Sequence, residues 1–135
     1  MEEEFLAAVE VVAEADGRYH KAGYLFIYDA LQHTVEKMGK TALPKEQRHV
    51  TGRDLLQGIS EYSLDQFGPL TASVFAQWGI HQTSDFGYMV FNLVEAELMS
   101  KTPQDSPEDF ADVFDFAEEF DWKKRKAQFK RQPAG

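Results

Sequence analysis

The chain of 135 residues contains no cysteine. This absence excludes disulfide bonds, zinc sites built from thiolates and a cysteine nucleophile, and it suits a reducing compartment. Long apolar runs are also missing, since no segment reaches the roughly 20 apolar residues that a membrane-spanning helix needs. Three glutamates follow the first methionine, where a secretory signal peptide would carry Lys or Arg. We therefore expect a soluble, cytoplasmic protein that does not act in a membrane.

Basic residues are nearly absent from the middle of the chain. Residues 51–120 contain thirteen acidic residues and two basic ones, Arg53 and Lys101. The last fifteen residues reverse this balance, with six basic residues and one acidic residue. The net charge is −9, so the body of the protein should repel polyanions such as DNA, and only the basic tail (residues 123–135) should attract them.

Catalytic and metal-binding motifs are absent as well. The four histidines are scattered, and no HExxH or HxxxH pair would place two imidazoles on one face of a helix. The sequence has neither a GxSxG elbow nor a phosphate-binding loop. The acids at positions 105–115 do not follow the spacing of an EF-hand loop, which favours a solvated acidic surface. The sequence therefore indicates no catalytic residue, no metal site and no cofactor.

Apolar residues are plentiful and recur at helical spacing. They make up 43% of the chain, and aromatic residues make up 13%, which suffices for one packed domain. The stretch from Thr51 to Asp54 has the pattern of a capping box, which predicts a helix that starts there. The periodicity predicts helices at residues 2–15, 21–40, 51–67, 70–78 and 84–98.

These elements predict one mainly α domain over residues 1–122. An N-terminal helix pair (1–40) would cover a tri-helical core (51–99) that resembles a helix-turn-helix. The acidic aromatic segment (105–122) follows, and it can be interpreted as a short helix or as the hairpin of a winged helix. Its alanines and carboxylates are poor strand formers, so they favour a short helix or mixed structure.

The helix-turn-helix pattern lacks the charges of a DNA reader. A recognition helix presents Arg, Lys, Asn or Gln to base edges in the major groove. The corresponding helix, residues 84–98, has no Lys or Arg and carries Asp85, Glu95 and Glu97. DNA phosphates would repel these carboxylates, so we expect this helix to serve packing.

The acidic aromatic segment is the first candidate for a binding surface. Aromatic side chains supply contact area, and the interleaved carboxylates would select a basic partner. We predict a non-catalytic protein-interaction module whose partner has a basic or apolar surface. An exposed apolar patch ringed by acids would support this function, whereas packing of these aromatics onto the helices would remove them from a partner. The predicted contact residues are Asp109, Asp112, Phe116, Glu119 and Trp122.

Two other functions stay open at this point. Tyr24 and Tyr28 lie one helical turn apart and could line a small-ligand or catalytic pocket with Trp78, although aromatic residues at this spacing usually form a core. The basic tail could contact nucleic acid without sequence preference, or it could neutralise the acids that precede it. The tail residues concerned are Lys123, Lys124, Arg125, Lys126, Phe129, Lys130 and Arg131.

Three stretches of the chain resemble a family of small conserved proteins of unknown function from Planctomycetes, Verrucomicrobia and related bacteria. They are "RYHKAGYLFIYDAL", "HVTGRDLLQGI" and "FGPLTASVFAQWGIHQTSDFGYMVFNLVEAELMSKTPQDSPEDF". The resemblance spans Arg18 to Phe120 and is most distinctive around Trp78 and Asp85-Phe86-Gly87. It implies a bacterial source and brings no activity, cofactor or site residue with it.

Overall fold

The structure is a computed structural model that describes residues 2–131, the last four of them as backbone only. Within this range the chain is mainly helical and has no strand, which confirms the predicted mainly α class. None of the described helices combines the length and apolar character that a bilayer crossing requires. The helices are α1 (Glu3–Asp16), α2 (Lys21–Lys37), α3 (Gly52–Phe67), α4 (Thr71–Gln77), α5 (Thr83–Glu95), α6 (Phe116–Glu119) and α7 (Trp122–Arg131). Three 3-10 turns connect them: η1 (Lys45–Gln47), η2 (Gly68–Leu70) and η3 (Pro107–Phe110).

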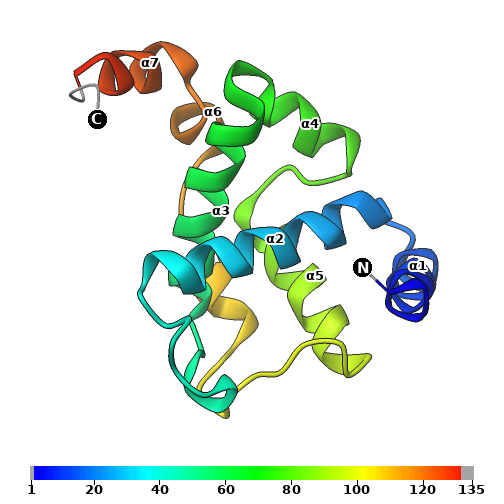
Figure 1. The fold of residues 1–135 in the computed structure, drawn as a ribbon. Coiled ribbons are helices and arrows are strands. Elements are labelled where there is room, and N and C mark those ends of the chain that lie inside the picture. Colours follow the sequence, from blue (N-terminus) through cyan, green and yellow to red (C-terminus); the bar gives the residue numbers. More distant parts are fainter. Residues whose placement is uncertain (1, 132–135) are drawn as a thin grey trace.

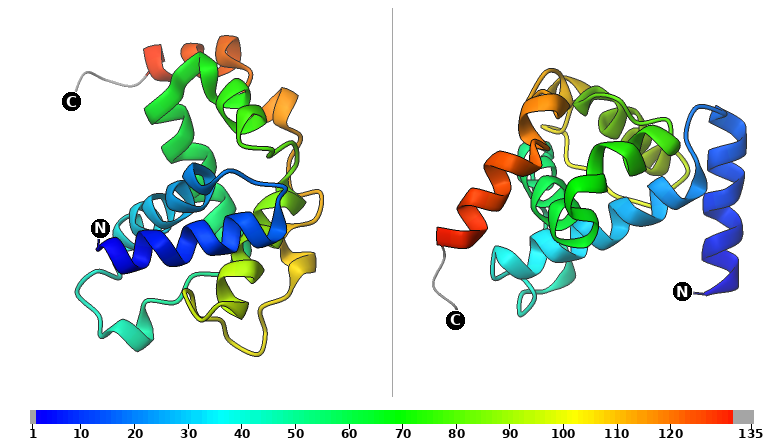
Figure 2. Two further views of the ribbon diagram at one scale, coloured as in Figure 1. Left: turned by 90° about the vertical axis from the view of Figure 1, so that its right-hand side faces the viewer. Right: turned by 90° about the horizontal axis from the view of Figure 1, so that it is seen from above.

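The helices pack around α2, which crosses the centre of the molecule (Figure 1). α3 packs against α2, and α5 contacts α1, α2 and α3. α1 stands at one edge of the molecule, as the right-hand view of Figure 2 shows. The acidic aromatic segment forms η3 and α6, so the hairpin alternative for this segment is wrong. Its first turn, η3, packs against α5 and α3.

Short-range signals set most helix boundaries. The capping box predicted at Thr51 is present: its hydroxyl accepts from the backbone N–H of Asp54 at 3.1 Å, and the carboxylate of Asp54 accepts from the backbone N–H of Thr51 at 3.3 Å. α1 ends at a left-handed Gly17 with φ of 80°. The helix predicted at residues 84–98 differs from α5 in the structure, which begins at Thr83 and ends at Glu95.

An aromatic cluster forms the centre of the core. The fully buried ring of Phe75 has five aromatic neighbours whose ring centres lie 5.2–6.1 Å away. Edge and tilted contacts of this kind stabilise the fold beyond the area that they bury. The neighbours are Phe26, Trp78, Phe86, Phe116 and Phe120. Since the last two come from the acidic aromatic segment, that segment is part of the core.

Two glycines allow helices to approach neighbouring elements closely. A Cβ atom at Gly58 of α3 would lie 1.8 Å from Oγ1 of Thr34 in α2. At Gly87 of α5 it would lie 2.8 Å from Cβ of Phe110. Both positions therefore require glycine, because there is no room for a side chain. Gly87 is the point at which the acidic aromatic segment docks on α5.

Candidate functional site

The aromatic side chains of the acidic aromatic segment point into the protein. Phe110 and Phe120 are buried, and Phe116 is half-buried within the aromatic cluster. Trp122 is also half-buried, and a Cβ atom at Gly68 would lie 3.5 Å from its ring. Of the two interpretations of this segment, the structure agrees with the one in which its aromatic side chains pack onto the helices.

Two of the predicted contact acids have internal partners. A carboxylate oxygen of Glu119 accepts from the Ser60 hydroxyl of α3 at 2.5 Å and pairs with the Arg125 guanidinium at 2.9 Å. Asp109 accepts from the backbone N–H of Ser106 at 3.0 Å and so caps η3. The contact with Ser60 ties the segment to α3, the Asp109 contact stabilises η3 within the segment, and both leave less charge for a partner.

Asp112 is the predicted contact residue that stays exposed. Its φ of 48° lies in the left-handed region, where the chain turns sharply between η3 and α6. It borders a polar hollow together with His81 and Asp115. Among the described residues, no group of three or more histidines and carboxylates is arranged to hold a metal ion.

Thr83 is a residue whose role the sequence did not reveal. Its side chain is buried beneath the acidic aromatic segment. The hydroxyl donates to the carbonyl of Phe110 at 2.6 Å and accepts from the backbone N–H of Val113 at 3.1 Å. It thereby satisfies two backbone groups of a segment that has no regular hydrogen-bonding partner there.

The predicted aromatic pocket is filled by the protein itself. Tyr24 is fully buried, and its hydroxyl accepts from the side-chain amide of Asn92 at 3.1 Å. The Tyr28 hydroxyl donates to the carbonyl of Leu98 at 2.6 Å. Burial raises the pKa of Tyr24, and it raises the pKa of Tyr28 to about 12. Trp78 belongs to the aromatic cluster, and none of the three residues lines a hollow described below.

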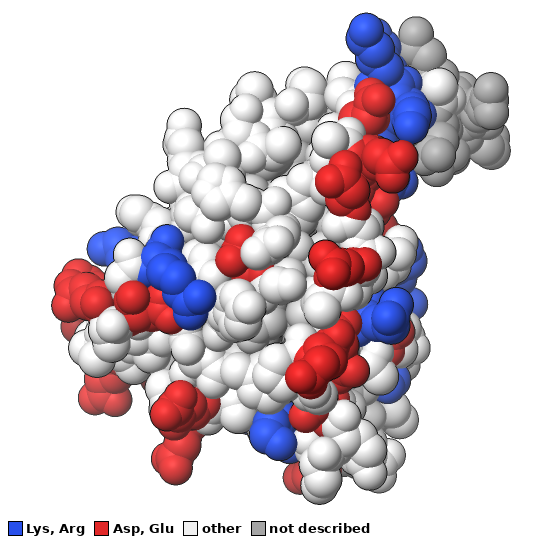
Figure 3. Space-filling view, turned by 180° about the vertical axis from the view of Figure 1, so that it is seen from behind, with Lys and Arg blue, Asp and Glu red and all other residues white. Residues whose placement is uncertain are grey.

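The basic tail is helical as far as Arg131. Arg125 pairs with Glu119, as expected if the tail neutralises neighbouring acids. In Figure 3 the basic side chains of α7 gather at one end of a face over which acidic side chains are spread. The exposed ones are Lys123, Lys124 and Lys126. The side chains of Phe129, Lys130 and Arg131 lie outside the described residues.

An apolar groove runs between α1 and α5, and we call it the α1–α5 groove. It has a volume of about 470 Å³. Val11 on its rim is 64% exposed, the highest value among the large apolar side chains described as exposed. The carboxylates that border it include Glu95, which is exposed. The lining residues are Val11, Val12, Ala15, Asp16, Asn92, Glu95 and Ala96.

Asp16 closes one end of the α1–α5 groove and ties three elements together. Its two oxygens accept from Nε and Nη2 of Arg18, each at 2.8 Å, and one of them accepts from the amide of Asn92 at 2.9 Å. The hydrogen bonds from Arg18 hold the pKa of this carboxyl well below its usual range. Asp16 therefore has a structural role, and Arg18 already compensates its charge.

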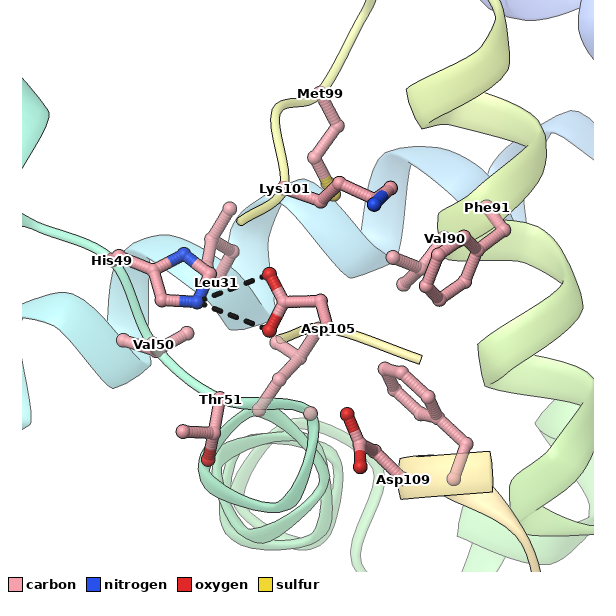
Figure 4. Close-up of a pocket in the computed structure, with 13 residues that line it drawn as sticks. Leu31, His49, Val50, Thr51, Val90, Phe91, Met99, Lys101, Asp105 and Asp109 are labelled. Carbon is pink, nitrogen blue, oxygen red and sulfur yellow. Dashed lines mark hydrogen bonds and ion pairs between the residues drawn. The ribbon is translucent and has the colours of Figure 1, made fainter. Parts of the chain in front are cut away.

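A second hollow lies between the loops that follow α2 and α5, and we call it the loop groove. It has a volume of about 400 Å³ and adjoins a smaller apolar cavity of about 50 Å³. Nε2 of His49 lies 3.2 Å from each carboxylate oxygen of Asp105 and so joins the two loops (Figure 4). Leu31, Val50 and Lys101 line both the groove and the cavity, as does His49.

The α1–α5 groove and the loop groove are two hollows on the surface of the described residues that internal contacts leave open. No known protein family, curated protein or solved structure matches the chain.

Proposed function

We propose that the protein is a non-catalytic interaction module that binds a basic, amphipathic segment of another protein in the α1–α5 groove. The observation that carries the proposal is the exposure of Val11, at 64%, beside a groove bordered by carboxylates. Contact with apolar side chains of a partner would remove this surface from water.

The residues that line the groove suit contact with a helix of a partner. Val11 and Ala15 lie one turn apart on α1, and Ala96 faces them from the end of α5. A partner helix with apolar residues at the same spacing could pack against all three. The floor is formed by Val12, which packs against the core, so the groove is supported from below.

The charge around the groove selects the kind of partner. Glu14 lies three residues after Val11, on the neighbouring turn of α1, and Glu95 lies on α5. Both are exposed, and neither forms an ion pair within the described part of the chain. Lys or Arg residues flanking the apolar face of a partner would meet these carboxylates, which favours basic segments and speeds their encounter.

The other functions predicted from the sequence have less support. A pocket at Tyr24, Tyr28 and Trp78 would need space that these side chains already fill. The helix-turn-helix-like character of residues 51–99 stays a prediction, and α5 offers DNA no Lys or Arg. The proposal also includes the bacterial source and the cytoplasmic location that the sequence predicts.

Nonspecific nucleic-acid binding stays an alternative for the basic tail alone. A continuous positive face formed by the tail with Arg18, Lys21 or Arg48 would favour it, but Arg18 pairs with Asp16 and Lys21 with Glu10. α7 and η1, which precedes Arg48, lie at opposite ends of the molecule (Figure 1 and the left view of Figure 2). This separation limits any such contact to the tail.

Fluorescence anisotropy with a labelled helical peptide tests the proposal. The probe is an amphipathic peptide of about 18 residues built from Leu and Lys, the length of five turns. We expect Val11→Lys to weaken binding at least tenfold, roughly 1.4 kcal/mol, because it replaces an apolar contact with a repelling charge. Thermal unfolding should be unchanged, since the side chain is exposed.

A matched control uses Leu70, which is 62% exposed and lies away from the groove. Leu70→Lys makes the same change of charge and apolar area, so it should bind the peptide within twofold of wild type. A peptide of Leu and Glu should not bind. Equal affinities of the Val11→Lys and Leu70→Lys variants would show that the peptide recognises only the net charge, and the proposal would be abandoned.

A further inference from the structure

Three cationic side chains in the loop groove have no carboxylate partner among residues 2–127. They are Lys45, Arg48 and Lys101. Nε of Arg48 donates to the carbonyl of Leu43 at 2.7 Å, which anchors the side chain. Nζ of Lys101 lies 3.4 Å from the carbonyl of Thr102, a long and weak contact. In a chain with a net charge of −9, three unneutralised cations around one hollow are unexpected.

The carboxylates nearest the loop groove only partly offset these charges. Glu46 lines the groove as well. Asp105 is engaged by His49 and by the backbone N–H of Thr102, which donates to it at 2.7 Å. Asp109, at the far side of the adjoining cavity, caps η3. The groove itself therefore presents three cations against one free carboxylate.

The adjoining cavity adds an apolar compartment to this positive groove. Its walls are largely apolar, and Figure 4 shows Lys101 reaching over the cavity toward Val90 and Phe91. At about 50 Å³ the cavity has room for a short alkyl group and not for a ring system of drug size. The apolar wall residues are Leu31, Val50, Leu55, Val90, Phe91, Met99 and Phe110.

We propose that the loop groove binds a small amphiphilic oxyanion. The carboxylate or phosphate head would lie against Arg48, Lys45 and Lys101, and a short alkyl group would enter the cavity. Guanidinium and ammonium groups form charge-assisted hydrogen bonds with such oxygens. The His49–Asp105 pair holds the two loops together, so it positions the cations that come from both loops. This site is separate from the α1–α5 groove and does not depend on the proposed function.

Two-dimensional 1H–15N NMR titrations test the site. The probes are inorganic phosphate, butyrate and n-butyl phosphate. We expect saturable shifts of amides in the two loops, with n-butyl phosphate binding at least threefold more tightly than inorganic phosphate because the alkyl chain fills the cavity. Butyrate distinguishes a general oxyanion site from one that selects phosphate.

Variants of two cations of the loop groove, the half-buried Arg48 and the exposed Lys101, separate this site from general charge. The Arg48→Gln/Lys101→Gln double variant should lose at least fivefold in affinity while its remaining spectrum stays that of the folded protein. The matched control is Lys123→Gln/Lys124→Gln in α7, which should bind as wild type. Shifts that do not saturate, shifts centred on α7, or equal affinity for inorganic phosphate and n-butyl phosphate would each overturn the proposal.

Discussion

α1 and the acidic aromatic segment have the same kind of composition but use their apolar residues differently. Both mix carboxylates with apolar side chains. In α1, Val9 and Ala13 are buried while Val11 faces solvent. In the segment, Phe110 and Phe120 are buried within a chain that is largely irregular. A regular helix keeps one face turned away from the protein, whereas an irregular segment can bend to bring each aromatic side chain inward.

This difference determines which acidic region keeps apolar side chains exposed to solvent. The acidic aromatic segment is anchored by its rings and by the Thr83 hydroxyl. α1 carries exposed apolar area that no described element covers. Composition alone favoured the acidic aromatic segment as the binding surface, whereas packing favours α1 for the proposed function.

Among the substitutions that test this contrast between the two regions, the one at Phe120 should have the largest effect on stability. Phe120→Ala removes a buried ring from the aromatic cluster, so urea denaturation should show a loss of about 3 kcal/mol in the free energy of unfolding. The control Val11→Ala should change it by less than about 0.5 kcal/mol, because that side chain is exposed. A loss below about 1 kcal/mol for Phe120→Ala would mean that the segment is not part of the core.

A smaller effect is expected from undocking the segment at Gly87. The methyl group of Gly87→Ala would lie 2.8 Å from Cβ of Phe110, and relieving this overlap should cost about 2 kcal/mol. Amide hydrogen exchange should accelerate for residues 106–120 more than for α1. Equal acceleration in both regions would indicate general destabilisation and would contradict docking at this glycine.

The smallest effect is expected at the end of α1. Asp16→Asn weakens the bonds to Arg18, and because Arg18 is exposed we expect a loss of only about 1 kcal/mol at neutral pH. The folded pKa of Asp16 lies below that of the unfolded chain, so this stabilisation is present at neutral pH and is lost as the pH falls through the folded value. The difference between wild type and variant should therefore shrink in acid.

Urea unfolding followed between pH 7 and pH 2 measures this difference. Glu14→Gln on the same helix is the control, since Glu14 is exposed and forms no hydrogen bond or ion pair within the described residues. Its stability relative to wild type should stay within about 0.5 kcal/mol throughout. A constant Asp16→Asn difference over the whole range would exclude the charge of Asp16 as the cause.

Features that depend on neighbours in sequence were predicted well. Apolar periodicity located the five longer helices before the acidic aromatic segment, and the Thr51–Asp54 capping box was found from its residue types. α1 ends at Asp16, one residue from the predicted boundary. These signals depend on hydrogen bonds and side chains within a few residues, so they can be read along the chain.

Features that depend on distant residues were missed. His49 and Asp105 are 56 residues apart, and no local pattern connects them. The packing role of Gly87 depends on Phe110, and the aromatic spacing of Tyr24 and Tyr28 is the same for a pocket and for a core. The predicted contact residues Phe116 and Trp122 had the composition of a binding surface, but packing turned their rings toward the helices.

By itself, the sequence determined the helical class, the positions of the helices and the separation of acidic and basic charge, because periodicity, capping and charge are properties of short stretches. Only the tertiary structure decided which apolar residues are buried and which hollows remain. That choice results from the close packing of distant side chains. The exposed face of α1 and the cations of the loop groove are consequences of that packing.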